Sequence, residues 1–273
     1  MPASATIQDL SSPTPPRLSH SLLELGRFAL EMSSSACLAP AFRWLPEGDG
    51  HAVMTLPGFM GADGSTAGLR RFLRRQGYSA LPWGQGRNLP EGGITSMIEA
   101  LDFRQQMEET LAARLEKEKL RSGGKVSLVG WSLGGLYATG MAHRYPDLVR
   151  QVVTLGTPFG DPRGTSIYSL LQRMYQAEVN AEMLSNWIDY TFAGDLQVPV
   201  TALYSRSDGF VGESIARLPA HPFMENIVVM ASHVGFPFNP LVKALLAERL
   251  AQPEDGWRRY QKPSLKPFVY RPV

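Results

Sequence analysis

Short apolar runs alternate with helical patterns along most of this chain. Six runs are predicted to form buried strands, at residues 52–56, 78–83, 126–129, 151–155, 199–204 and 226–230. Four segments between or after them are predicted to be helices, at residues 65–75, 95–121, 136–145 and 240–250. Short β-branched runs between helices are typical of parallel strands. The alternation therefore predicts an α/β fold whose mainly parallel sheet carries helices on both faces.

The two ends of the chain differ in composition from its centre. Residues 1–19 are rich in proline, serine and threonine, which predicts a disordered leader before a single domain over residues 20–273. Residues 252–273 hold four prolines, and this tail is expected to lie over the surface of the body. The aromatic residues that should hold the tail there are Trp257, Tyr260, Phe268 and Tyr270.

Two helical patterns carry specific expectations about which face is buried. The helix over residues 21–38 should pack on the body through Leu22, Leu25, Phe28, Ala29 and Met32. A helix lying on a membrane surface is the alternative, but its polar face has few of the basic residues that such helices use. The helix over residues 65–75 should turn its apolar side inward and leave a solvated basic cluster, consisting of Arg70, Arg71, Arg74 and Arg75.

An insertion over residues 161–197 interrupts the regular alternation. Its apolar residues recur at helical spacing in two groups, which are Ile167, Leu170, Leu171, Met174 and Tyr175, and then Met183, Leu184, Trp187, Ile188 and Phe192. We interpret the insertion as a helical cap or lid over the carboxyl ends of the strands, where it supplies an apolar wall. Ordinary core packing is the alternative interpretation.

Composition and charge exclude several classes of function. The net charge of +2 over 273 residues favours neither nucleic acid nor an acidic partner. The single cysteine, Cys37, excludes an intrachain disulfide, and the five histidines lack metal-binding spacing, so we expect neither a metal nor a cofactor. No apolar run approaches ~18 residues and no secretory signal is evident. We therefore expect a cytoplasmic protein without an integral membrane segment.

The segment KVSLVGWSLGG, at residues 125–135, is the strongest indication of chemistry. A short apolar strand leads into the pentapeptide GWSLG, and a helical pattern follows. A serine on such a turn is held in a strained conformation with its hydroxyl clear of the sheet, and the helix N-terminus faces the reacting oxygen. Gly130 and Gly134 let the strand and the helix approach closely. This context predicts that Ser132 is a nucleophile.

A serine nucleophile needs a base within hydrogen-bond reach and a third group that orients the base. In an open α/β sheet these groups should follow later strands, at the same edge as the serine. Asp208 follows the strand that ends at Tyr204, and His233 follows the strand that ends at Met230. An alternative base is His143, and the alternative acids are Asp189, Asp195 and Glu213.

At this point the sequence resembles the α/β-hydrolase superfamily, and within it the bacterial lipases and esterases. The similarity covers about residues 53–250. The segments that carry it are PGF at 57–59, GWSLGG at 130–135, LGTPFG at 155–160, YSRSDGFV at 204–211 and SHVGF at 232–236. The resemblance implies an α/β-hydrolase fold in which Ser132 is the nucleophile, His233 the general base and acid, and Asp208 the residue that orients His233.

The resemblance also implies where an oxyanion is bound. The donors would be the backbone N–H groups of Phe59 and Leu133, with Met60 as an alternative to Phe59. Many relatives have His-Gly where this chain has Pro57-Gly58. Because the donors are backbone amides, the change need not remove the oxyanion hole, but it alters what supports the loop.

The predicted reaction is transfer of an acyl group from a small-molecule ester to Ser132 and then to water. An apolar wall beside the serine favours esters with a hydrophobic acyl chain. The side chains expected to bind this chain are Trp131, Phe159, Leu171, Met174, Trp187 and Ile188. A thioesterase or acyltransferase with the same triad is an alternative, and a binding scaffold without catalysis is a further one.

Overall fold

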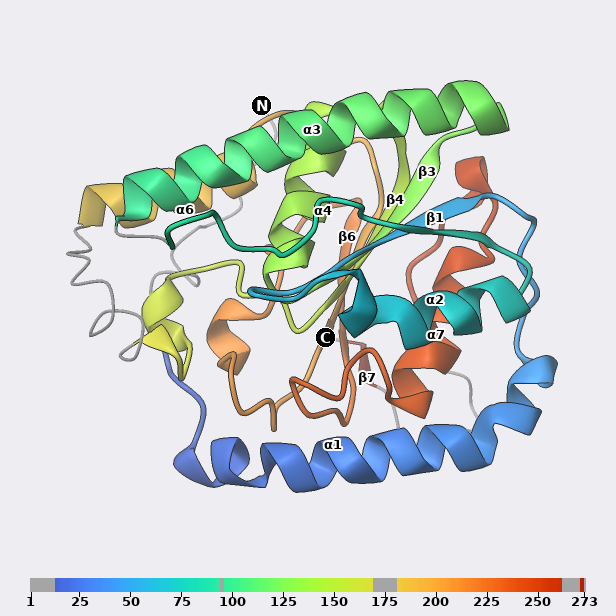
Figure 1. The fold of residues 1–273 in the computed structure, drawn as a ribbon, viewed down its shortest axis with the longest axis horizontal. Coiled ribbons are helices and arrows are strands. Elements are labelled where there is room, and N and C mark those ends of the chain that lie inside the picture. Colours follow the sequence, from blue (N-terminus) through green and yellow to red (C-terminus); the bar gives the residue numbers. More distant parts are fainter. Residues whose placement is uncertain (1–12, 94–95, 169–180, 262–270, 273) are drawn as a thin grey trace.

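The structure is a computed structural model of the chain and describes residues 13–93, 96–168, 181–261 and 271–272 (Figure 1). A single sheet runs through its centre in the order β2-β1-β3-β4-β5-β6-β7. The strands are β1 (Ala52–Leu56), β2 (Ser79–Pro82), β3 (Val126–Trp131), β4 (Val149–Leu155), β5 (Val200–Tyr204), β6 (Met224–Val228) and β7 (Arg271–Pro272). The first six are parallel to their neighbours, which confirms the predicted parallel sheet, and β7 pairs antiparallel with β6.

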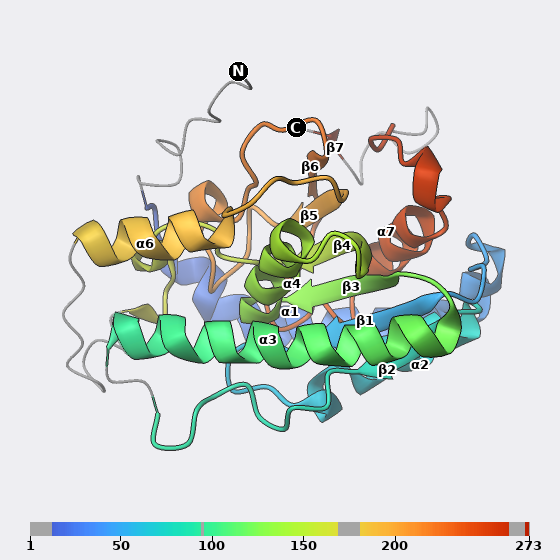
Figure 2. The ribbon, with the colours of Figure 1, turned by 90° about the horizontal axis from the view of Figure 1, so that it is seen from above.

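Helices cover both faces of the sheet (Figure 2). The α-helices are α1 (Leu18–Leu38), α2 (Ala67–Arg75), α3 (Met97–Ser122), α4 (Leu133–Arg144), α6 (Ala181–Thr191) and α7 (Pro240–Leu250). Short 3-10 helices lie at η2 (Ala39–Trp44), η3 (Asp63–Thr66), η4 (Pro162–Gly164), η5 (Glu213–Ile215) and η6 (Glu254–Gly256). An apolar core lies on each face of the sheet, and successive residues of β1 point into different cores. Met54 packs with α3, α4 and α6, and Val53 packs with α2 and α7.

The second apolar pattern of the insertion forms α6, while the first lies largely outside the described residues.

A buried ionic network binds α6 to the body. Arg104 of α3 is fully buried and donates hydrogen bonds to Glu108 and to Thr191 of α6. Glu108 also pairs with Arg144 of α4 and accepts a hydrogen bond from Tyr190 of α6. Because both signs of charge are buried together, α6 is held in one place above the ends of the strands.

The prediction that all four arginines of α2 are solvated is wrong for Arg70. Its guanidinium is buried, donates to Thr55 and Thr66, and lies 3.7 Å from a carboxylate oxygen of Asp63. Asp63 also accepts the backbone N–H groups of Trp83 and Gly84. Arg70 therefore joins α2 to the loops at the end of β1 and β2.

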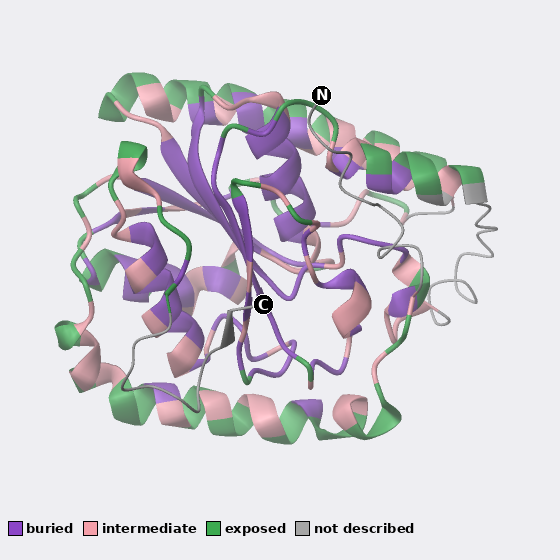
Figure 3. Cartoon of the chain, turned by 180° about the vertical axis from the view of Figure 1, so that it is seen from behind, coloured by how far each residue is buried: buried purple, intermediate pink, exposed green. Residues whose placement is uncertain are grey.

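The predicted orientation of α1 is also wrong, because its apolar face points outward. Leu22 and Leu25 are each 75% exposed, Met32 is 46% exposed and Ala29 is exposed. Of the five residues expected to pack on the body, Phe28 does so, with its ring 5.2 Å from that of Phe238. Figure 3 shows α1 along one edge of the molecule with mostly exposed and half-buried residues. Its buried residues are polar.

The inward side of α1 is a polar stripe that binds two loops of the body. Ser21 donates to the carbonyl of Gly209 at 2.6 Å, and Arg27 donates to the carbonyl and hydroxyl of Ser207. Glu31 accepts the backbone N–H of Ser232 at 2.7 Å. The stripe therefore spans the loop after β5 and the loop after β6.

Glu24 lies at the centre of this stripe and is 3% exposed. One carboxylate oxygen accepts the N–H of Gly209 at 2.7 Å and the N–H of His233 at 3.0 Å. The other oxygen accepts the N–H of Val234 at 3.2 Å. A carboxylate that accepts three backbone N–H groups satisfies donors that would otherwise be buried without a partner. Glu24 therefore joins the two loops through one side chain.

Replacing Glu24 should destabilise the protein far more than replacing its neighbour. We expect Glu24→Ala to lower the free energy of unfolding by roughly 2–4 kcal/mol, because three buried N–H groups lose their acceptor. Leu25→Ala, one position away on the exposed face, should change it by less than about 0.5 kcal/mol. Urea unfolding of both variants measures the difference. Equal losses would contradict the assignment of the polar side of α1 as its inner side.

The described part of the chain contains no helix that is long and apolar enough to cross a membrane. The leader over residues 1–19, the extent of the domain and the cytoplasmic location stay predictions. Helix α1 begins at Leu18, and residues 1–12 lie outside the described part. Of the tail aromatics, Tyr260 is buried and Trp257 is half-buried, while Phe268 and Tyr270 lie outside the described residues.

Candidate active site

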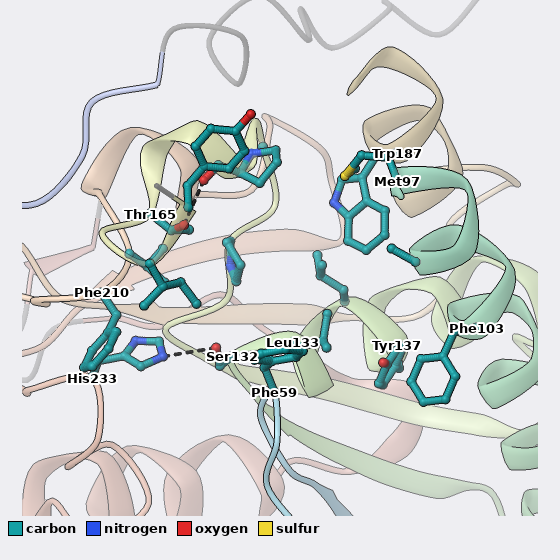
Figure 4. A pocket seen from close by; sticks show the side chains of 18 of the residues that line it. Phe59, Met97, Phe103, Ser132, Leu133, Tyr137, Thr165, Trp187, Phe210 and His233 are labelled. Carbon is teal, nitrogen blue, oxygen red and sulfur yellow. Dashed lines mark hydrogen bonds between the residues drawn. The ribbon is translucent and has the colours of Figure 1, made fainter. Parts of the chain in front are cut away.

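Three side chains meet at the carboxyl edge of the sheet, each carried by the segment after a different strand. Ser132 follows β3, Asp208 follows β5, and His233 follows β6. Nε2 of His233 lies 3.0 Å from Oγ of Ser132, and Nδ1 of His233 lies 2.8 Å from Oδ2 of Asp208. Figure 4 shows the imidazole pointing at the serine. The structure thus brings together the serine, base and acid that the sequence predicts.

Ser132 occupies a strained turn between β3 and α4. Its φ of 52° and ψ of −121° lie in a region that non-glycine residues rarely adopt. The serine N–H donates to the carbonyl of Leu155, and its own carbonyl accepts hydrogen bonds from Gly135 and Thr157. These bonds on both sides hold the turn in place, so the surrounding structure maintains the strained conformation.

Close packing requires a glycine at position 134, two residues after Ser132. A Cβ on Gly134 would lie 2.5 Å from the carbonyl oxygen of Leu56 and 2.6 Å from that of Pro57. Both are backbone atoms of β1 and the loop after it, which cannot move without shifting the sheet. Gly134 therefore allows α4 to start directly against the end of β1, whereas the sequence predicts close approach to the strand that precedes Ser132. Gly130 provides that second contact, because a Cβ there would lie 2.5 Å from the carbonyl oxygen of Gly134.

Hydrogen bonds from the backbone hold the Asp208 carboxylate in place beside the imidazole of His233. Its second oxygen, Oδ1, accepts the N–H groups of Phe210 and Val211, each at 2.8 Å, and the side chain is almost fully buried. Burial of the His233 ring favours its neutral form and acts to lower its pKa. The negative charge and hydrogen bond of Asp208, with a further contribution from Glu24, outweigh burial, so the pKa of His233 is raised above its ordinary value.

The competing residues are occupied elsewhere. His143 lies 3.3 Å from the carbonyl of Gly194, and burial lowers its pKa. His51 contacts Asp49 and Ser127. The alternative acids have their own partners: Asp189 accepts from Ser185, Asp195 from Gln197, and Glu213 from Arg206.

The loop after β1 lies against the serine. A Cβ on Gly58 would lie 3.1 Å from that of Ser132, so the two segments are in close contact. The Met60 N–H is already bonded to the carbonyl of Asn88 at 2.9 Å, which favours Phe59 over Met60 as a donor to substrate. Leu133 is the first residue of α4, where an N–H has no partner within the helix.

Asn88 was not identified from the sequence, yet it supports this loop. It is fully buried, and its side-chain amide donates to the carbonyl of Pro57 at 2.9 Å. Its Oδ1 accepts the hydroxyl of Tyr137 on α4 at 2.8 Å, and its backbone N–H donates to Gly61. Asn88 thus ties the loop to α4 at the position where Pro57-Gly58 departs from the common pattern. A lone asparagine in the Gly-rich segment 84–93 gives no sequence signal of this role.

A cavity of about 210 Å³ adjoins Ser132 and is lined mostly by apolar side chains. In Figure 4, His233 and Phe210 lie at one side of it, and Met97, Phe103 and Trp187 lie at the other. Its lining therefore comes from α3, α4 and α6 and from the loops after β1, β4, β5 and β6. The contribution of α3 was not predicted, because a long helix with a charged outer face gives no sign that its N-terminal end reaches the serine.

The predicted substrate-binding residues are placed in three different ways. Trp187 lines the cavity. Phe159 and Ile188 are buried in the core beside α4, and Trp131 packs on the opposite core while its Nε1 donates to the carbonyl of His233 at 3.0 Å. These three are not among the residues that line the cavity. Leu171 and Met174 lie outside the described residues.

Within the described ranges there is no group of three or more histidine, cysteine or acidic side chains arranged to hold a metal ion. The buried polar groups around Ser132 instead bond to one another or to backbone.

Comparison with solved structures finds the same fold in proteins of low sequence identity. A lipase of Bacillus licheniformis superposes with a TM-score of 0.56 at 18% identity, over 76% of this chain and 94% of the lipase. Lipase B of Aspergillus fumigatus gives 0.55 at 19% identity, over 77% of this chain and 53% of the lipase. A metagenome-derived lipolytic enzyme gives 0.52 at 17% identity, over 75% and 93% of the two chains. At these identities the likeness concerns the fold.

No curated protein matches this sequence. A family model described as the alpha/beta hydrolase family matches residues 31–269, which is most of the chain. The matched range includes the segments that hold Ser132, Asp208 and His233, but it begins after Glu24. By this match and by its fold, the chain belongs to the alpha/beta hydrolase family.

Proposed function

We propose that this protein is a serine hydrolase that cleaves small-molecule carboxylic esters with an apolar acyl chain. The observation that carries the proposal is the continuous hydrogen-bonded series Ser132, His233 and Asp208 at the wall of an apolar cavity. A serine hydroxyl becomes nucleophilic when an oriented imidazole accepts its proton. The serine, its base and the group orienting the base are all present at hydrogen-bond distance.

The reaction proceeds in two steps. Oγ of Ser132 attacks the ester carbonyl carbon as its proton passes to Nε2 of His233. The C–O bond to the alcohol then breaks, and the leaving oxygen takes that proton. In the second step His233 takes a proton from water, the resulting hydroxide attacks the acyl carbon, and the acid departs as Ser132 regains its proton. Asp208 stabilises the imidazolium in both steps without becoming protonated.

The backbone N–H groups of Phe59 and Leu133 are proposed to bind the oxyanion. Phe59 and Leu133 both line the cavity beside Ser132. Donors fixed by Asn88 and by the start of α4 need not reorganise when charge develops on the substrate oxygen. One such donor typically contributes ~3 kcal/mol to lowering the barrier.

The lining of the cavity supports the choice of acyl chain. Met97, Phe103, Leu136 and Trp187 present carbon atoms and little that would bind a charged or strongly polar substrate. A thioesterase or an acyltransferase would use the same three residues and differ in leaving group or acceptor. A scaffold that only binds ligand is the third possibility. Comparing hydrolysis of oxygen esters with that of acyl-thioesters at equal chain length separates an esterase from a thioesterase.

Removal of the nucleophile should abolish ester hydrolysis in a folded protein. We expect Ser132→Ala and His233→Ala each to lower kcat on a p-nitrophenyl ester by about 10⁶-fold, and Asp208→Asn by about 10⁴-fold. A fluorophosphonate should label the wild type once, at Ser132, and should not label Ser132→Ala. Far-UV circular dichroism and a thermal melt establish that each variant is folded. Turnover close to wild type in folded Ser132→Ala would contradict the mechanism. An inactive His143→Ala beside an active His233→Ala would contradict the assignment of the base.

The acid limb of the pH profile should lie above the ordinary histidine range. Only neutral imidazole accepts the serine proton, and the pKa of His233 is raised, so kcat/KM should increase with pH through a value above about 6.5. Glu24→Gln removes one of the charges that raise this pKa and nearly preserves the side chain's size. The limb should therefore shift to lower pH in Glu24→Gln.

Glu213→Gln is the matched control for this shift. Glu213 is an exposed carboxylate paired with Arg206. Its removal should leave the acid limb where it is in the wild type. The measurement is kcat/KM for an acetate ester from about pH 5 to pH 9. An acid limb that moves equally in both variants, or in neither, contradicts a specific effect of Glu24 on His233.

Trp187 should control which acyl chains are preferred. We expect Trp187→Ala to shift the optimum ester length while changing kcat/KM for an acetate ester little, because each methylene buried against the wall contributes ~0.8 kcal/mol. Trp187→Phe, which keeps an aromatic wall, should shift it less. The measurement is kcat/KM for acetate to decanoate esters, with a thermal melt of each variant. A uniform decrease that follows lost stability would assign Trp187 to the core instead.

A further inference from the structure

The outer side of α1 is rich in exposed apolar residues. Six leucines and one methionine of this helix are between 46% and 75% exposed, and they are Leu18, Leu22, Leu23, Leu25, Leu30, Met32 and Leu38. They make up more than half of the large exposed apolar residues in the described part of the chain. A patch of this kind on a helix of 21 residues, ~31 Å long, marks an interaction site in most proteins.

This outer side has no charged side chain, because the charges of α1 are used inside. The acidic and basic residues of α1 are Glu24, Arg27 and Glu31. All three bind the loops after β5 and β6. The helix is therefore amphipathic in the sense opposite to that of an ordinary surface helix, with polar groups on the protein and leucines away from it.

A basic groove of about 440 Å³ continues from the C-terminal half of this apolar surface. Met32 and Ala36 belong to both, since they line the groove and lie at the end of the exposed side of α1. The other walls come from η2, α2 and α7. The groove contains four cations and no acidic residue among those that line it, and the cations are Arg43, Arg71, Arg75 and Lys243.

Lys243 is the most informative of these cations because it is 9% exposed. Its Nζ donates to the hydroxyl of Ser35 at 2.6 Å and lies 5.6 Å from the ring centre of Phe42. No carboxylate of the described residues pairs with it, and burial together with the charge of Arg75 lowers its pKa to about 8. Buried cations are normally neutralised by an anion, so this groove is suited to an anionic group.

Trp44, which lies just beyond α1, favours lipid as the source of that anion. Trp44, in η2 next to Arg43, is 74% exposed, and the two side chains stack at 4.8 Å. Tryptophan beside arginine is typical of the boundary between lipid headgroups and acyl chains. A second copy of this chain would bring the same four cations, whereas an anionic bilayer supplies opposite charge and an apolar layer together.

We propose that the outer side of α1 and the adjoining basic groove dock this protein on an anionic lipid surface. The leucines of α1 enter the boundary between headgroups and acyl chains, and the groove formed with Arg71, Arg75 and Lys243 takes a lipid phosphate. The binding is reversible and peripheral, because the helix lies along the surface and stays bonded to the body. It concerns a face other than the cavity at Ser132 and does not depend on the proposed esterase activity.

Vesicle binding without substrate tests this proposal. The Ser132→Ala chain is used, so that hydrolysis of lipid esters cannot alter the vesicles. We expect it to sediment with vesicles of equal parts phosphatidylglycerol and phosphatidylcholine, and at least ~10-fold less with phosphatidylcholine alone. Binding should weaken as sodium chloride increases. Tryptophan emission should shift to shorter wavelength on binding, and Trp44→Phe should remove most of that shift.

Two double variants and two matched controls locate the surface. Leu22→Glu with Leu25→Glu, and separately Arg71→Glu with Arg75→Glu, should each reduce binding to the mixed vesicles at least ~10-fold. Leu120→Glu and the pair Lys117→Glu with Arg121→Glu alter exposed residues of α3, on the other side of the sheet, and should leave binding unchanged. Thermal melts show whether each variant keeps its fold.

Several outcomes would overturn the proposal. Equal binding to neutral and anionic vesicles would remove the role of the groove, and binding unaffected by either double variant would move the site elsewhere. Light scattering that shows a dimer, dissociated by Leu22→Glu with Leu25→Glu, together with no vesicle binding, would make the surface an interface between copies. Stabilisation by inorganic phosphate without vesicle binding would indicate a soluble anion instead of lipid.

Discussion

The start of α4 against the end of β1 is the constraint on which the rest of the site depends. Ser132 is held at a positive φ because β3 must turn into α4 within one residue, and Gly134 leaves no room for a side chain against the carbonyl oxygens of Leu56 and Pro57. That contact also sets the loop after β1 beside the serine. Ser132 and the proposed oxyanion donors therefore derive their positions from one backbone packing, which short-range sequence largely determines.

Asp208 and His233 are positioned by a helix that lies far from them in the sequence. Asp208 and His233 lie on loops, and loops are less constrained than strands unless other groups bind them. Here a helix that precedes the sheet in the chain supplies those groups, since Glu24 accepts N–H groups from both loops. Glu24 lies before residues 31–269, the range that the family model matches, so this contact to the loops of Asp208 and His233 comes from outside that range.

The fold and the meeting of Ser132, Asp208 and His233 at one edge of the sheet were predictable because local patterns specify them. Six strand positions, the turn at Ser132 and the places of Asp208 and His233 after their strands all follow from apolar runs and short motifs. The orientation of α1 was not predictable, since burying apolar residues is the usual rule, and the exception depends on backbone N–H donors that lie 185 to 210 residues away from Glu24. Asn88 escaped notice for the same reason, because its side-chain partners, Pro57 and Tyr137, are 31 and 49 residues away. Arg70 was predicted to be solvated because it belongs to a run of arginines, and the pattern does not show that it is buried among polar groups of the segment before it.

Helix α1 connects the positions of Asp208 and His233 with the exposed leucines on its own outer side. Burying the Glu24 carboxylate is costly unless several donors meet it, and the loops of Asp208 and His233 provide three. Once the polar residues of α1 are committed to that task, its leucines have no core left to enter and must face outward. The same requirement that fixes the acid and the base thus creates an apolar surface next to them. Anything that covers this surface therefore contacts the helix that binds the loops of Asp208 and His233.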